Sequence, residues 1–215
     1  MIDSVGLEDA GPIARDLVAA IVGDAARLSE LDGAIGDGDH GINMSKGFRL
    51  ADARLADAAP DLAQGLEILG DTLLNEIGGS MGPIYGTFFG EMGRRFGDAG
   101  RINRSSFASA LHAATGAVQE LGGAAPGDKT LIDVLVPALA AYDKAVNRDD
   151  SFAACLNAMN DAAGDGLEAT RDMIAKVGRA ARLGERSRGT PDPGAASCRL
   201  LLATLADGLR KRLQR

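Results

Sequence analysis

One short loop concentrates residues that could bind a metal ion. It contains three carboxylates within eight positions, with glycines between them, and reads Asp32-Gly33-Ala34-Ile35-Gly36-Asp37-Gly38-Asp39-His40-Gly41-Ile42-Asn43. Carboxylates this close repel one another, so a folded site needs a cation. Hard divalent ions prefer oxygen ligands, and magnesium shared with phosphates is the usual case. Asp32, Asp37 and Asp39 are therefore candidate metal ligands.

This loop has two other interpretations. An isolated Asp-Gly-Asp is most often a solvated turn that caps the next helix, but the third aspartate, the histidine and the asparagine favour a metal site. A calcium EF-hand requires a glutamate at the twelfth loop position. Counted from Asp37 or from Asp32, that position holds Phe48 or Asn43. The EF-hand is therefore rejected.

Two further loops are rich in glycine. The segment Gly78-Gly79-Ser80-Met81-Gly82-Pro83 leads into a helix, where free backbone N–H groups bind anions; a plain turn between helices is the alternative. The segment 122–130 resembles a P-loop, but Asp128 separates Gly127 from Lys129 and a helix precedes it. A P-loop follows a strand and has lysine directly after glycine. We therefore reject a P-loop and expect Asp128 to cap the next helix, with Thr130 in its first turn.

The fourth loop is basic in an otherwise acidic protein. Arg179, Arg182, Arg186 and Arg188 fall within ten residues of a chain whose net charge is -7. Arginine side chains suit phosphate groups, whereas a solvated basic loop is the alternative. Beside a magnesium loop, we expect at least one of these arginines to contact phosphate.

The elements that carry these loops are helices. Apolar residues recur every three or four positions, as in Leu62, Leu66, Leu69, Leu73 and Ile77, which predicts one apolar stripe per helix. The expected helices span 12–31, 41–57, 62–77, 83–96, 105–121, 129–147, 151–177 and 193–213. Ser105 and Ser106 before Phe107 and Asp192 before Pro193 are the expected N-caps of two of them. If neighbours run antiparallel, alternate connections share one end. The loops at 32–43, 78–82, 122–128 and 178–192 are alternate connections, so one site at one end is expected.

Length and composition limit the class of protein. The 215 residues fit a single domain, 1–215. An acidic chain gains nothing from a nucleic-acid backbone, so no nucleic-acid partner is expected. No apolar run reaches the roughly 20 residues of a membrane span, and the N-terminus lacks a signal peptide. We expect a cytoplasmic protein whose Cys155 and Cys198 are buried thiols.

Together the four loops resemble those of one enzyme family, the nucleotide-binding L subunit of dihydroxyacetone kinase. The resemblance runs along nearly the whole chain and is carried by Gly36-Asp37-Gly38-Asp39-His40-Gly41-Ile42-Asn43, Gly82-Pro83-Ile84-Tyr85-Gly86-Thr87-Phe88-Phe89, Gly127-Asp128-Lys129-Thr130, Leu183-Gly184-Glu185-Arg186-Ser187 and Asp192-Pro193-Gly194. Two segments depart from the family pattern: Ser80-Met81 stands where Ala-Ser is usual, and Ala181-Arg182 where Ser-Tyr is usual.

The resemblance implies an all-α fold, an eight-helix antiparallel barrel with ADP or ATP at one open end. It implies that Asp32, Asp37 and Asp39 hold two magnesium ions. It implies nucleotide contacts from His40, Gly41, Ile42, Asn43, Ser80, Met81, Gly122, Leu131, Arg179, Asp192, Pro193 and Gly194. His40 and Arg179 are candidate phosphate contacts, and no residue is identified as a catalyst.

The resemblance also implies a phosphotransferase that is active only with a partner. A separate K subunit holds dihydroxyacetone or a related short ketose on a histidine, and the basic loop around Arg182, Arg186 and Arg188 is a candidate contact for it. The donor is either ATP, or ADP recharged by a phosphocarrier M subunit of the sugar phosphotransferase system. A nucleotide-binding regulatory protein without turnover is the alternative function.

Overall fold

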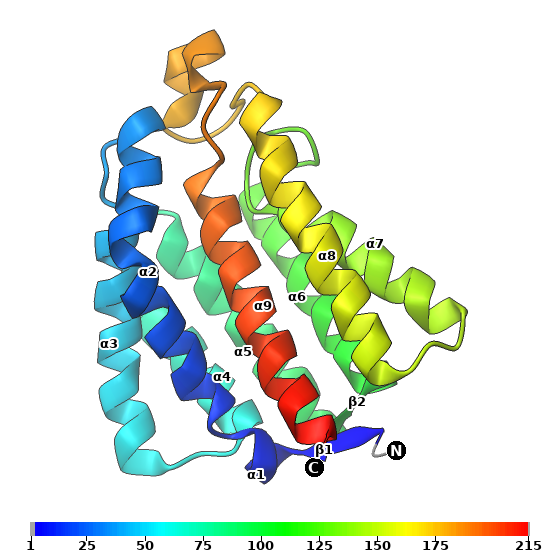
Figure 1. Cartoon of the computed structure of the whole chain (residues 1–215). Coiled ribbons are helices and arrows are strands. Elements are labelled where there is room, and N and C mark those ends of the chain that lie inside the picture. Colours follow the sequence, from blue (N-terminus) through cyan, green and yellow to red (C-terminus); the bar gives the residue numbers. More distant parts are fainter. Residues whose placement is uncertain (1–2, 215) are drawn as a thin grey trace.

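The computed structural model describes residues 3–214, and their main elements are long helices (Figure 1). The long helices are α2 (Ile13–Ile35), α3 (His40–Ala58), α4 (Leu62–Glu76), α5 (Met81–Ala99), α6 (Arg104–Gly122), α7 (Ile132–Asn147), α8 (Phe152–Ala169) and α9 (Pro193–Leu213). The short elements are β1 (Ser4–Gly6), α1 (Leu7–Ala10), β2 (Arg101–Asn103), η1 (Thr170–Asp172) and η2 (Ala180–Ser187). The expected set of eight helices is confirmed.

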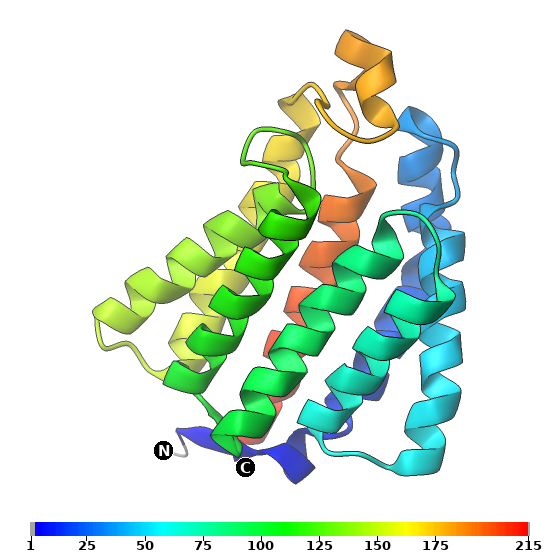
Figure 2. The same ribbon diagram turned by 180° about the vertical axis from the view of Figure 1, so that it is seen from behind.

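The long helices form a closed antiparallel ring. Each packs against its neighbours along the chain, and α9 closes the ring by packing against both α8 and α2 (Figures 1 and 2). At the end of the ring that holds both chain termini, β1 pairs antiparallel with β2. The sequence did not predict this short sheet. The eight-helix antiparallel barrel expected from the resemblance is confirmed.

The helix boundaries follow local hydrogen bonding. Asp61 and Asn103 each form a capping box at the start of α4 and α6, and Asp192 caps α9 through the N–H of Ala195, which satisfies backbone donors that a helix start leaves free. Asp192 was expected in this role. The cap of α6 was placed at Ser105 and Ser106, but these two residues lie in its first turn.

Two expected helices are shorter than the periodicity suggested. The helix expected from residue 129 begins at Ile132, because residues 127–131 form a turn in which Lys129 has a φ of 63°. The helix expected to reach residue 177 ends at Ala169. The chain then crosses the upper end of the ring as η1, an irregular segment and η2 (Figure 1).

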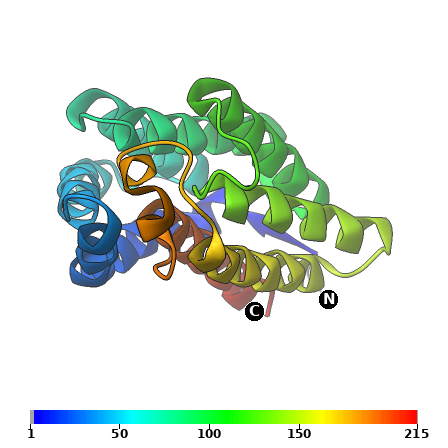
Figure 3. The same ribbon diagram turned by 90° about the horizontal axis from the view of Figure 1, so that it is seen from above.

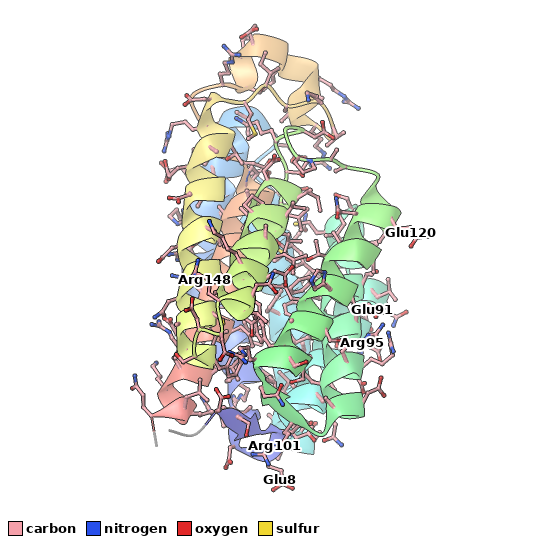
Figure 4. All side chains as sticks on the ribbon, turned by 90° about the vertical axis from the view of Figure 1, so that its right-hand side faces the viewer. Glu8, Glu91, Arg95, Arg101, Glu120 and Arg148 are labelled. Carbon is pink, nitrogen blue, oxygen red and sulfur yellow. The ribbon has the colours of Figure 1, made fainter. Side chains whose placement is uncertain are left out.

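Apolar side chains of moderate size fill the interior of the ring. The stripe from Leu62 to Ile77 is buried, as is the stripe from Phe107 to Val118, whereas Leu121 is 52% exposed at the upper end. Both cysteines are buried free thiols, as expected. Charged side chains lie on the outer side of the ribbon, including Glu91, Arg95 and Glu120 (Figure 4). Among helices of the described residues, none is long and apolar enough to cross a membrane.

Helices α7 and α8 approach closely at one of two glycines in α8. A Cβ at Gly166 would lie 2.3 Å from the carbonyl oxygen of Asp133, whereas a Cβ at Gly164 would meet nothing within 4 Å. Gly164→Ala should therefore raise the free energy of unfolding by up to about 1 kcal/mol. Gly166→Ala should lower it by about 1–3 kcal/mol, because α8 must move away from α7. Denaturant titration followed by circular dichroism compares them, and equal effects would contradict this packing.

Candidate functional site

Alternate helix connections meet at the upper end of the ring, above the starts of α3, α5, α7 and α9 (Figures 1 and 3). A cavity of about 700 Å³ opens there, a size typical of small-molecule sites. A helix start carries unpaired N–H groups and a partial positive charge. Four such starts around one cavity therefore favour an anionic ligand.

Most of the residues expected to contact a nucleotide line this cavity. The lining includes Asp32, Asp39, His40, Asn43, Ser80, Met81, Gly122, Leu131, Arg179, Asp192, Pro193 and Gly194. Asp37, Gly41 and Ile42 do not line it. Gly41 is buried against α2, where a Cβ would lie 1.9 Å from the carbonyl oxygen of Ala25, and Ile42 is 65% exposed. Gly41 thus lets α3 start close to α2.

The three expected metal ligands come together. Asp32, Asp37 and Asp39 each offer a carboxylate oxygen, and these oxygens lie within 4.8 Å of one another. Asp32 projects from the last turn of α2, and its Oδ2 accepts a 3.2 Å hydrogen bond from the backbone N–H of His40. Gly36 leaves room for this carboxylate, because a Cβ there would lie 2.3 Å from its Oδ1.

Arg179 provides a positive charge to this cluster. Its Nη1 pairs with the carboxylate of Asp37 and lies 3.2 Å from Oδ2 of Asp39. The guanidinium of Arg179 therefore lies between two of the three carboxylates, where a metal ion could bind. An all-oxygen donor set that already attracts a positive group fits a hard divalent ion.

The fourth loop separates its arginines. Arg179 lines the cavity, whereas Arg182, Arg186 and Arg188 are exposed on and after η2 and do not line it. Arg188 lies 3.6 Å from Glu185. Arg179 is therefore the arginine of this loop that could contact a ligand in the cavity, and the other three are exposed away from its lining.

The opposite wall of the cavity is apolar. Ile84, Val118, Leu121 and Ile132 line it from α5, α6 and α7, which lie across the opening from α2 and α3 (Figure 3). The cavity thus has a charged side and an apolar side. This division suits a ligand with a charged group at one end and a flat, weakly polar group at the other.

Asp133, for which the sequence analysis predicted no role, holds the third loop. Asp133, 4% exposed, accepts hydrogen bonds from the N–H groups of Gly127 at 2.5 Å and Thr130 at 2.8 Å. The expectation that Asp128 caps α7 was wrong. Asp128 accepts the N–H of Ala125 and pairs with Lys176 instead. The turn at 127–131 delays the start of α7 because Asp133 satisfies its N–H groups from within the helix.

Lys129 connects this turn to the segment that covers the upper end. It is 1% exposed, and its Nζ donates to the carbonyl oxygens of Met173 at 3.3 Å, Ser187 at 2.6 Å and Thr190 at 2.7 Å. The three acceptors match the three donors of a lysine ammonium. Lys129 therefore fixes residues 173–190, which carry Arg179, over the cavity.

A buried polar chain lies beside the cavity. His40 Nε2 is 2.9 Å from Ser197 Oγ, which is 2.7 Å from the hydroxyl oxygen of Tyr85. Both hydroxyls also reach the carbonyl oxygen of Gly194, at 3.1 and 3.2 Å. Burial lowers the pKa of His40 and raises that of Tyr85. Ser197 could not have been singled out, because a lone serine in an alanine-rich helix carries no sequence signal.

Asp192 makes stability depend on pH. Desolvation raises the pKa of its carboxyl from 3.8 to about 7. The hydrogen bond from the N–H of Ala195 and the charge of Lys129 act in the opposite direction and lower the pKa, but desolvation is the larger effect. Between these pKa values the unfolded chain loses this proton while the folded chain keeps it. The contribution of Asp192 to stability therefore falls as pH rises, by at most about 1.4 kcal/mol per pH unit, and levels off above the folded pKa.

Asp192→Asn keeps an N-cap and removes this titration. The free energy of unfolding of the wild type relative to the variant should therefore fall between about pH 4 and pH 7 and stay constant above about pH 8. Denaturant titrations of both proteins across this range, without nucleotide, measure the difference. A constant difference at all pH values would contradict the assignment.

Comparison with known proteins gives one consistent family. The model of the DAK2 domain matches residues 34–207. D-erythrulose kinase of Mycolicibacterium smegmatis is 39% identical over 211 residues, which cover 95% of this chain and 36% of that protein. The ADP-binding subunit DhaL of PEP-dependent dihydroxyacetone kinase 2 of Listeria innocua is 37% identical, with 94% of each chain covered.

A solved structure is similar as well. The crystal structure of the dihydroxyacetone kinase from C. freundii in complex with AMP-PNP and Mg²⁺ matches with a TM-score of 0.68 and 25% identity, covering 96% of this chain and 35% of that one. The chain therefore spans about a third of some relatives and nearly the whole of others.

Proposed function

The chain belongs to the DAK2 domain family, and on that premise we propose that it is the subunit of a short-ketose kinase that binds ADP or ATP with magnesium. In this proposal a phosphoryl group passes to dihydroxyacetone or a related ketose held on a separate K subunit. The observation that carries it is the cluster of Asp32, Asp37 and Asp39 at the charged side of a cavity whose other side is apolar. Named relatives are kinases, including D-erythrulose kinase and ADP-binding DhaL subunits.

The cavity has a suitable binding position for each part of a nucleotide. Phosphates would lie near the starts of α3, α5 and α9, where N–H groups and helix dipoles favour anions. The base would lie against the apolar wall that includes Val118 and Leu121. Arg179 lies beside the carboxylates. It would turn toward phosphate oxygens when a metal ion binds Asp37 and Asp39 in its place.

Asp32, Asp37 and Asp39 would hold the magnesium ions, which we propose number two. When bound, magnesium neutralises charge on phosphate oxygens during transfer. The chain's own residues orient the nucleotide: the helix starts fix the phosphates and Lys129 keeps the covering segment in place. In such chemistry positioning and charge stabilisation supply most of the rate enhancement.

The substrate would be held by a partner. The chain has two histidines. His112 is exposed and pairs with Asp143 at 2.9 Å, and His40 is buried with Ser197. We propose that neither captures the ketone, because His40 lies beside the carboxylate cluster, where it would serve the nucleotide. The exposed Arg182, Arg186 and Arg188 near the cavity mouth would contact the K subunit, where charge speeds encounter more than it tightens the complex.

The metal assignment is tested by one carboxylate. Asp37→Asn should weaken magnesium-dependent ADP binding by at least about tenfold, because a ligand of the cation loses its charge, while the helical content stays unchanged. Titration calorimetry with and without magnesium measures the effect. Asp57→Asn, which removes an exposed aspartate of α3, is the matched control and should bind like the wild type. Wild-type affinity in Asp37→Asn would contradict the assignment.

The catalytic proposal is tested by reconstitution. The purified chain with ATP, magnesium and dihydroxyacetone should show no turnover alone and should gain it when a K subunit is added. Replacing ATP by ADP with a phosphocarrier M subunit and its phosphoryl source identifies the donor. Turnover by the chain alone would place the ketose site here. Tight nucleotide binding without turnover under any of these conditions would favour a regulatory nucleotide-binding protein.

A further inference from the structure

We infer that Ser197, in contact with Tyr85 and with the carbonyl oxygen of Gly194, is a positioning residue that holds the ring proton of His40 on Nε2, so that His40 presents an unprotonated Nδ1 to the cavity. Through that nitrogen His40 would accept a hydrogen bond from an O–H group of the magnesium–nucleotide complex and would not donate one to a phosphate oxygen. The first part concerns the protein without ligand. The second part rests on the proposed function.

Counting hydrogen atoms shows which groups donate and which accept in this row of buried side chains. The four contacts join His40 to Ser197, Ser197 to Tyr85, and both hydroxyls to the carbonyl oxygen of Gly194, which can only accept. If Nε2 carries a proton, three donors are available for these contacts. If Nε2 is an acceptor, Ser197 must donate to it, and Tyr85 is then the one donor left for the remaining three contacts.

Burial makes each of these hydrogen bonds matter. Ser197 is 0% exposed, Tyr85 3% and His40 7%, so water has little access to replace a missing hydrogen bond. With Nε2–H, three of the four contacts can be hydrogen bonds, whereas with Nε2 as an acceptor only two can. These hydrogen-bonded side chains also join the start of α3 to the start of α9 at Gly194. They therefore fix the ring of His40 relative to the loop that carries Asp192.

The other ring nitrogen faces a different environment. Within residues 3–214, Nδ1 of His40 has no hydrogen-bond partner in the protein, and His40 lines the cavity. In the neutral imidazole with Nε2–H, Nδ1 is an acceptor. A phosphate oxygen is also an acceptor and would be repelled. Ribose hydroxyls and magnesium-bound water are the two sources of O–H donors in a magnesium–nucleotide complex.

The position of His40 beside the acidic cluster supports such a contact. Its backbone N–H is bonded to Asp32, and it directly follows Asp39. An O–H donor held at these carboxylates would therefore be near the ring. The expectation that His40 contacts phosphate is replaced in this proposal by a contact to an O–H group.

Nitrogen-15 spectroscopy tests the proton position. The chain has two histidines, so His112→Gln, at an exposed position, leaves the signals of His40 alone. At about pH 8, above the ordinary histidine pKa of about 6.5, long-range ¹H–¹⁵N spectra of the ligand-free protein should show a protonated Nε2 and an unprotonated Nδ1. A proton on Nδ1 would overturn the proposal.

Two substitutions in the same buried chain separate positioning from mere packing. Ser197→Ala removes the partner of Nε2, so the nitrogen shifts should move toward the average of two tautomers, and magnesium–ADP affinity should fall by up to about tenfold. Tyr85→Phe leaves the His40–Ser197 and Ser197–Gly194 contacts intact, so the tautomer should be retained. A single Nε2–H tautomer in folded Ser197→Ala, confirmed by circular dichroism, would overturn the role of Ser197.

Ligand titrations identify the O–H donor. A shift of the Nδ1 signal with magnesium alone indicates metal-bound water, whereas a shift that requires ADP together with magnesium indicates a nucleotide hydroxyl; either result supports the proposal. No shift with saturating magnesium and ADP, when calorimetry shows binding, would overturn the contact. If calorimetry shows no binding, the proposed function fails, while the ligand-free spectra still decide the role of Ser197.

Discussion

The mutual repulsion of Asp32, Asp37 and Asp39 is the constraint that the upper end of the molecule must satisfy. Their oxygens lie within 4.8 Å of one another, and such a group is tolerated where positive charge is supplied. Arg179 supplies it in this structure, with the N–H of His40 beside it. A metal ion bound in place of the Arg179 guanidinium would supply the same positive charge and would also attract phosphates. The acidic cluster therefore determines which ligands the upper end of the molecule favours.

Holding Arg179 at that position requires a framework. The segment 173–190 has little regular structure apart from η2, and the ammonium of Lys129 binds it through three carbonyl oxygens. Lys129 is in turn placed by the turn that Asp133 organises. A lysine in a glycine-rich loop thus acts here on carbonyl groups of the chain itself, unlike the phosphate-binding lysine of a P-loop.

The ring of helices allows four loops to share one end. Because neighbouring helices alternate in direction and α9 returns to α2, every second connection arrives at the cavity. The core holds no tryptophan, and aliphatic residues of moderate size fill much of it, so helices can approach closely at glycines such as Gly41 and Gly166. The site is thereby built on rigid helix ends, with one segment laid over it.

The sequence by itself determined the helices and the acidic loop, because these depend on short-range periodicity and on residues close along the chain, whereas the antiparallel order of the helices was implied by the family resemblance. It placed Asp32, Asp37 and Asp39 together and Asp192 at a helix start. It could not show that Asp133 would replace Asp128 in ordering the third loop, that Lys129 would be buried, or that Ser197 would meet His40 from a distance of 157 positions. Those contacts depend on how α3, α7 and α9 face one another, and only the closed ring decides which polar groups lose water and must find partners within the protein.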